Sequence, residues 1–136
     1  MMLSQATVYA LQALVALAHG SEARLASHLI ARGHGLPERF LLKVLRPLVA
    51  AGVLDSLKGP NGGFRLARPA SRITLLEVVE AVEGPWRGVA PPVGNQEGGA
   101  LNRRLAVVCQ RVTAHERKVL GGVSVAELAK GPVRGK

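Results

Sequence analysis

The spacing of apolar residues changes character at residue 53. Before that point, three segments place apolar side chains three and four residues apart, as on one face of a helix. From 53 to 68 the pattern becomes that of two short strands, 53–58 and 64–68, joined by Gly-Pro-Asn-Gly-Gly at 59–63. Asn-Gly is a strong signal for a tight hairpin. The sequence therefore predicts three helices followed by a β-hairpin.

Local signals bound the three helices. Ser4 is a predicted cap for the first helix, which should end near Gly20, and the second helix covers about 24–32. The third begins near Pro37 and contains Pro47, which should remove one backbone hydrogen bond and kink the helix. The predicted core-facing side chains of the first helix are Val8, Leu11, Leu14, Val15 and Ala18.

Two capping boxes predict helix starts after the hairpin. Thr74 with Glu77 opens a helix that ends near Gly84, and Ser124 with Glu127 opens a short terminal helix. In such a box each side chain hydrogen-bonds the other residue's backbone amide, which satisfies donors at the helix start. These starts are therefore well defined by local chemistry.

A long helix is predicted between the two boxes. Its apolar positions step by four and three residues over two and a half heptads, and they are Leu101, Leu105, Val108, Val112, His115 and Val119. A helix of about 20 residues spans roughly 30 Å and would leave a long apolar stripe exposed on so small a protein. We therefore predict a homodimer interface here. The alternative is that the stripe packs on the first and fourth helices of the same chain.

These elements predict a mainly α fold with a small β-hairpin, namely a winged helix-turn-helix domain plus a long C-terminal dimerisation helix. The predicted division is a DNA-binding domain over 1–84 with its wing at 53–68, a flexible Gly- and Pro-rich loop at 85–99, the two C-terminal helices at 100–130 and a tail at 131–136.

The charge of the chain favours an anionic partner. The net charge is +9 over 136 residues, and residues 1–72 hold nine Lys and Arg against three Asp and Glu. Clustered basic side chains displace counterions from a phosphate backbone, so the predicted partner is double-stranded DNA. The rival interpretation is a winged-helix module that binds protein and has lost DNA readout, for which Pro47 in the third helix is an argument.

Candidate DNA-binding residues come from the third helix and the wing. Basic side chains on one helix face can reach base edges or phosphates, and a Gly-rich wing suits phosphate or minor-groove contact. The candidates are Arg39, Lys43, Arg46, Lys58, Gly59, Asn61, Gly62, Gly63 and Arg65, with Arg68 continuing the basic rim of the hairpin.

The sequence argues against an enzyme and against membrane insertion. The four histidines show no metal-ligand spacing, and Glu77, Glu80 and Glu83 have the spacing of one exposed helix face. No apolar run approaches the roughly 18 residues of a membrane span, and the apolar stretch at 8–18 lacks the basic residues that precede a signal-peptide core. We expect a cytoplasmic protein without cofactor or metal.

Several segments together resemble the Rrf-two (Rrf2) family of bacterial transcription regulators, which includes IscR, NsrR and CymR. The resemblance is strong over residues 2–85 and weaker but collinear over 100–130. Its most specific parts are the wing run from Gly59 to Ala67 and the run Thr-Leu-Leu-Glu-Val-Val-Glu-Ala-Val-Glu-Gly at 74–84. The resemblance implies a dimer formed through the long helix, operator binding by the third helix and wing, and usually repression.

The resemblance also implies where an iron–sulfur cluster would bind, namely at three cysteines between the fourth helix and the dimerisation helix. The stretch 86–104 contains no cysteine, and the family's last cluster cysteine and histidine fall near Arg103 and Ala106. Such clusters need thiolate ligands, so we expect none here. Cys109 is the sole cysteine, to be interpreted as a small buried side chain or as a thiol sensor. The expected regulator then responds to a partner protein, to an unknown small-molecule effector, to a thiol event or to no signal.

Overall fold

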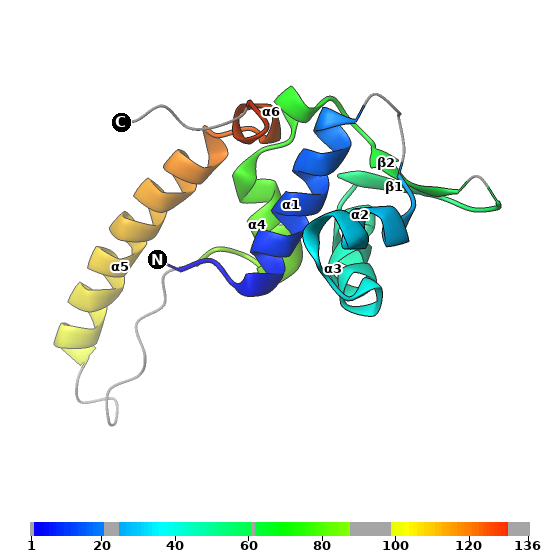
Figure 1. Ribbon diagram of the computed structural model, residues 1–136. Coiled ribbons are helices and arrows are strands. Elements are labelled where there is room, and N and C mark those ends of the chain that lie inside the picture. The colour runs from blue at the N-terminus through cyan, green and yellow to red at the C-terminus, as the bar shows by residue number, and fades with distance from the viewer. Residues whose placement is uncertain (1, 21–24, 61, 88–98, 131–136) are drawn as a thin grey trace.

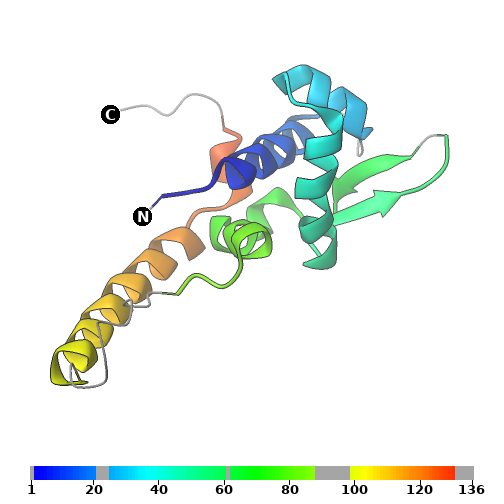
Figure 2. The same cartoon turned by 90° about the horizontal axis from the view of Figure 1, so that it is seen from below.

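The computed structural model describes residues 2–20, 25–60, 62–87 and 99–130. A helical body carries a hairpin at one end, while a long helix leaves the body at the opposite end (Figure 1, Figure 2). In chain order the elements are α1 (Gln5–His19), α2 (Ser27–His34), α3 (Glu38–Ala50), β1 (Leu54–Leu57), β2 (Gly63–Leu66), η1 (Ala70–Arg72), α4 (Leu75–Glu83), α5 (Gly99–Gly121) and α6 (Val125–Leu128). The predicted mainly helical fold with one hairpin is confirmed.

Helices α1 to α3 begin and end for local reasons. The Ser4 side chain accepts a hydrogen bond from the Thr7 amide at 3.1 Å, as the sequence predicted. Helix α2 ends at Gly35, whose φ of 65° lies in the left-handed region that glycine adopts without strain. Only two residues separate Gly35 from α3, so α2 and α3 form a helix-turn-helix pair.

Helix α3 continues past Pro47 to Ala50. Proline has no backbone N–H, so the carbonyl four residues earlier lacks its usual helical donor. In α3 that acceptor is the carbonyl of Lys43. Lys43 is exposed, so water can satisfy that oxygen. The proline is therefore accommodated without ending the helix.

The core lies where α1 crosses the other helices. Its fully or almost fully buried apolar side chains are Ala10, Ala13, Leu14, Leu17, Ile30, Ala31, Leu41, Val44, Leu45, Leu48, Val53, Leu54, Ile73, Val78 and Val125. The predicted stripe of α1 is partly wrong, because Val8 is 40% exposed and the buried face also uses Thr7, Ala10 and Ala13. Small alanine side chains let the surrounding helices approach, an effect that hydrophobicity alone does not indicate.

The wing is shorter than predicted and is joined to the body by a third segment. Its strands pair antiparallel, with Leu54 opposite Leu66 and Leu57 opposite Gly63. Leu25, which precedes α2, exchanges two backbone hydrogen bonds of 2.8 and 2.9 Å with Phe64. Gly63 has a φ of 143°, and a Cβ there would lie 2.5 Å from the Leu25 carbonyl oxygen. Glycine at 63 is thus required for this close approach.

The two predicted capping boxes are confirmed, and they lie side by side. Thr74 and Ser124 form an antiparallel bridge, and backbone hydrogen bonds of 2.8 Å join Leu75 to Val123 and Val125 to Ile73. Because α6 follows α5 directly, this bridge fixes the C-terminal end of α5 on the body. The loop residues 88–98 and the predicted tail 131–136 lie outside the described residues.

Leu45 and Leu29 allow a test of where the core lies. Leu45 has no exposed surface, whereas Leu29 is 47% exposed. We expect Leu45→Ala to lower the free energy of unfolding by about 2–5 kcal/mol, because a core cavity is left. Leu29→Ala should change it by less than about 0.5 kcal/mol.

Urea denaturation at one fixed protein concentration measures both values. Equal effects of the two substitutions would contradict the assigned core.

Candidate functional site

Helix α3 presents a basic face to solvent. Arg39, Lys43 and Arg46 are exposed and lie four and then three residues apart, so they share one side of the helix. The opposite side is buried in the core through Leu41, Val44, Leu45 and Leu48. The ion pairs among the described residues involve none of the three basic side chains. The structure thus brings these three candidates together on one surface.

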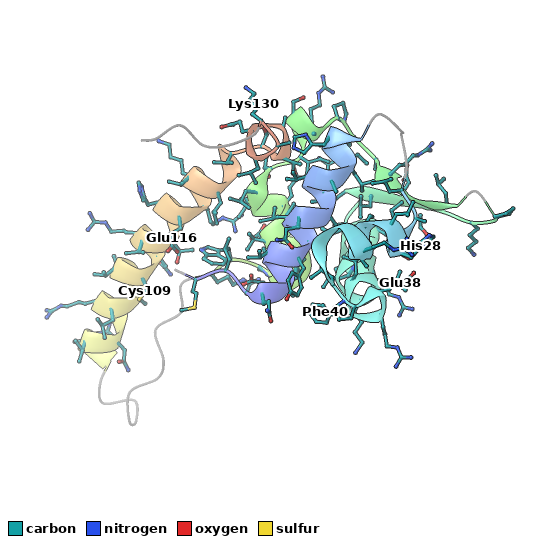
Figure 3. The ribbon with its side chains drawn as sticks, viewed as in Figure 1. His28, Glu38, Phe40, Cys109, Glu116 and Lys130 are labelled. Atoms are coloured by element: carbon teal, nitrogen blue, oxygen red, sulfur yellow. The ribbon has the colours of Figure 1, made fainter. Side chains whose placement is uncertain are left out.

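The start of α3 is tied to the start of α2. The Ser27 hydroxyl donates a hydrogen bond of 2.6 Å to the Glu38 carboxylate. The ring of Tyr9 on α1 also meets the ring of Phe40 on α3 edge to face, with centroids 5.3 Å apart. Glu38 and Phe40 are labelled in Figure 3. These contacts orient α3 on the body.

The wing carries the second group of candidates. Lys58 and Arg65 are exposed, and Arg65 forms an ion pair of 3.3 Å with Asp55 on the paired strand. Both partners are about half exposed, and such pairs contribute only about 0–1 kcal/mol, so Arg65 can exchange Asp55 for a phosphate. Gly59 and Gly62 lie at the turn, and Asn61 falls outside the described residues.

Arg68 does not belong to the basic rim as the sequence analysis expected. Its guanidinium is turned inward and hydrogen-bonds Glu77 on α4 and two backbone carbonyls. Its partner Glu77 lies nine residues further along the chain, on α4, and charge patterning does not indicate that the two side chains meet.

The three glutamates of α4 form only in part the exposed helix face that was predicted, because Glu83 is exposed whereas Glu77 and Glu80 are half-buried. Each carboxylate holds a different part of the protein, and none of these links is visible from sequence spacing. Their partners are Arg68 for Glu77, Arg117 and the Trp86 amide for Glu80, and Thr7 and the Ser4 amide for Glu83.

These contacts lower the pKa of all three carboxyls. The hydrogen bond from Arg68 is the main cause of the lowered pKa of Glu77, and a backbone amide donor is the main cause for Glu80. Burial raises the pKa of Glu83, but hydrogen bonds from the start of α1 outweigh it and the pKa is lowered overall. The ionised form of each glutamate is therefore the one that the fold stabilises.

A cavity of about 460 Å³ lies between the segment after α4 and the adjacent face of α5. Cys109 and Glu116 project from α5 toward the body and line it (Figure 3). The Trp86 indole donates a hydrogen bond of 2.9 Å to Glu116, which ties this segment to α5. Cys109 is half-buried. The sequence predicted no such contact, and its one available sign is a lone tryptophan in a Gly- and Pro-rich stretch.

The predicted seam of α5 is exposed in the single chain. Leu101, Val108, Val112 and Val119 are each more than half exposed, and Leu105 is 38% exposed. His115 is exposed as well. The helix meets the body through a different side, on which Thr113 and Leu120 are buried. In the described residues of the single chain, the seam is thus largely exposed and is not buried against α1 or α4.

Residues 3–131 match the Rrf2 family, described as "Iron-dependent Transcriptional regulator". Protein aau3 of Rhizobium meliloti (strain 1021) is 45% identical over 83 residues, which cover 61% of this chain and 54% of aau3. The chain thus spans about half the length of that relative.

Two further proteins are similar over nearly the whole chain. BadM of Rhodopseudomonas palustris (strain ATCC BAA-98 / CGA009), described as an HTH-type transcriptional regulator, is 35% identical over 96% of this chain and 82% of its own length. CymR, the global cysteine regulator of B. subtilis, has the same fold, with a TM-score of 0.74 and 24% identity over 95% of this chain and 96% of CymR.

None of the helices that the structure describes combines the length and apolarity that crossing a bilayer requires. The family and BadM are described as transcriptional regulators, which agrees with the expectation that the chain is not an enzyme. With a family match over almost all of its length and a winged helix-turn-helix fold, this chain belongs to the Rrf2 family of transcriptional regulators.

Proposed function

We propose that this protein represses transcription by binding a palindromic operator as a homodimer, in the cytoplasm of a bacterium. Each copy places α3 in the major groove and the wing along the neighbouring backbone or minor groove. The observation that carries this proposal is the exposed basic face of α3 beside the wing, in a member of a transcriptional regulator family.

The chemistry of the side chains divides their roles. Arg39 can make a bidentate contact with guanine, and Lys43 and Arg46 can reach neighbouring bases or phosphates. Lys58 and Arg65 on the wing suit phosphate contact, which adds affinity without sequence preference. All five side chains are exposed.

The rival function, a protein-binding module without DNA readout, rested on Pro47. Helix α3 continues past this residue, and Arg39, Lys43 and Arg46 all precede it along the helix. Pro47 removes the helical donor of the Lys43 carbonyl, but α3 remains continuous, so the three basic side chains still share one exposed face. This favours DNA binding over the rival.

The exposed seam of α5 supports the homodimer. Monomeric soluble proteins rarely expose long apolar stripes, and a heptad-spaced stripe on a helix pairs well with a second copy of itself. A two-fold dimer would present its two α3 helices to half-sites about one helical turn, roughly 34 Å, apart. The palindromic operator follows from this symmetry.

The residues present do not fit an iron–sulfur cluster held by this chain. Iron–sulfur clusters are bound mainly by several cysteine thiolates, and this sequence has one cysteine. Within the described ranges, no three His, Cys, Asp or Glu side chains gather as a metal site. We therefore propose a cluster-free regulator whose signal is a partner protein, a small ligand or a thiol event at Cys109.

DNA binding can be tested on fragments selected from genomic DNA. We expect saturable binding that weakens about tenfold or more in Arg39→Ala, because base contacts contribute about 1–3 kcal/mol each. Lys43→Ala should weaken binding and lower the slope of log K against log salt by about one if Lys43 contacts a phosphate. Fluorescence anisotropy over a salt series measures both quantities.

Lys130→Ala is the matched control, because Lys130 is exposed on the terminal segment after α6, away from α3 (Figure 3). It should bind as the wild type does. Absence of saturable binding by the wild-type protein would contradict the proposed function, and unchanged affinity of both α3 variants would contradict the site.

The dimer interface can be tested with two valines of α5. Val112 and Val107 are almost equally exposed, at 53% and 54%, but only Val112 lies on the seam. We expect Val112→Glu to yield a monomer, since two buried carboxylates would have to lose their hydration.

Val107→Glu should leave the protein dimeric. Sedimentation equilibrium distinguishes the two states. A monomeric wild type, or a dimeric Val112→Glu, would show that the seam is not the interface.

The absence of a cluster can be tested by iron and acid-labile sulfide analysis after anaerobic purification. We expect far less than one iron per chain and no visible absorbance band, because the thiolates that hold a cluster are missing. Stoichiometric iron accompanied by such a band would contradict this expectation.

A further inference from the structure

The side chain of Arg68 joins three elements at the base of the wing. Its Nη2 donates to Glu77 Oε1 at 2.7 Å, its Nη1 donates to the Arg72 carbonyl at 2.8 Å, and its Nε donates to the Gly52 carbonyl at 3.4 Å. Every nitrogen of the guanidinium therefore has an acceptor. A planar fork with donors in fixed directions is needed for this, and a lysine ammonium cannot replace it.

The three acceptors belong to different parts of the structure. Gly52 lies in the turn between α3 and β1, Arg72 ends η1, and Glu77 lies in the first turn of α4. Arg68 itself follows β2 by two residues. One side chain thus links the exit of the wing to its entrance and to the helical body.

We propose that Arg68 is a positioning residue, which sets the orientation of the wing relative to α3 without contacting DNA itself. The inference rests on the proposed function, because it concerns how two DNA-reading elements are held. A two-stranded hairpin is marginally stable alone, and these strands have four residues each. Besides Arg68, the wing is held by Leu54, Phe64 and Leu66, which pack in or against the core. It is also held by the backbone pair between Leu25 and Phe64, which lies nearer the tip.

Glu77 serves two contacts with its two oxygens. Oε1 accepts from Arg68, while Oε2 accepts from the Thr74 amide at 2.9 Å and completes the capping box of α4. Glutamine can fill the same place in a capping box. Its amide nitrogen cannot accept a hydrogen bond from Arg68, however. Glu77→Gln therefore removes the hydrogen bond between Arg68 and Glu77 (the clamp) while keeping the capping box of α4.

The contact between Arg68 and Glu77 also fixes the position of the wing relative to α5. Thr74, which caps α4, pairs with Ser124 just beyond α5. In a dimer formed through α5, the contact between Arg68 and Glu77 would hold each wing at a set position relative to the two-fold axis. Loss of the clamp should therefore weaken binding to a two-half-site operator, although Arg68 adds no phosphate contact.

The test compares Arg68→Met with Arg65→Met. Arg65 lies on the wing, where its side chain suits direct phosphate contact. We expect Arg68→Met to weaken operator binding about tenfold or more with an unchanged slope of log K against log salt. Arg65→Met should weaken binding and lower that slope by about one. Glu77→Gln should behave as Arg68→Met does.

Amide hydrogen exchange of the free protein supplies a readout that needs no DNA. We expect exchange in residues 54–57 and 63–66 to become at least tenfold faster in Arg68→Met and Glu77→Gln, with α1 and α3 unchanged. Arg65→Met should leave it near the wild-type rate. If Arg68→Met does not fold, Glu77→Gln carries the test.

Two results would overturn the proposal: wild-type exchange and affinity in Glu77→Gln, or a salt slope lowered in Arg68→Met as in Arg65→Met. The second result would make Arg68 a direct DNA contact. Absence of DNA binding by the wild-type protein would instead remove the proposed function, while the exchange rates still decide whether Arg68 orders the wing.

Discussion

The packing of α1 against its neighbouring helices is the interaction on which the rest of the structure depends. Ala10, Ala13 and Leu14 have no exposed surface, and α1 packs against α3, α4 and α6. Its small side chains permit close packing, and the buried Thr7 hydroxyl is satisfied by Glu83 at 2.5 Å. Because α3 and the C-terminal α6 are both packed on α1, one helix sets the position of the basic face of α3 relative to the exposed seam of α5. A shift of α1 would disturb both together.

Polar contacts then define the ends of the elements that the core positions only roughly. Helix α4 contributes three glutamates, which reach the wing through Arg68, α5 through Arg117, and the start of α1 through Thr7. Partly exposed pairs of this kind contribute little to stability. Their directional hydrogen bonds nevertheless select one orientation among several that apolar packing would tolerate. Under the proposed function, this orientation matters because α3 and the wing would have to fit one stretch of DNA at the same time.

The stretch between α4 and α5 is where the resemblance to the Rrf2 family would place an iron–sulfur cluster, and we propose that this chain holds none. The family is described as iron-dependent, whereas this sequence has a single cysteine. The segment after α4 is held to α5 by the Trp86 indole on Glu116 and by Arg117 on Glu80. Ordinary hydrogen bonds thus connect the two helices beside the cavity that Cys109 lines. A signal that acts on this regulator through the same region would have to alter those contacts.

Most elements could be predicted because their causes are local. These causes are the helical spacing of apolar residues, the caps at Ser4, Thr74 and Ser124, and the Asn-Gly pair in the hairpin turn. The same holds for the basic face of α3, since residues three and four apart on a helix share a side. The sequence alone thus determined the order of the elements, the family resemblance and most of the candidate contacts. Only the tertiary structure decided that Val8 is exposed, that Arg68 turns inward, that the α4 glutamates are engaged and that the α5 seam is uncovered. Each of these depends on which elements pack together in three dimensions, and spacing along the sequence does not specify that packing.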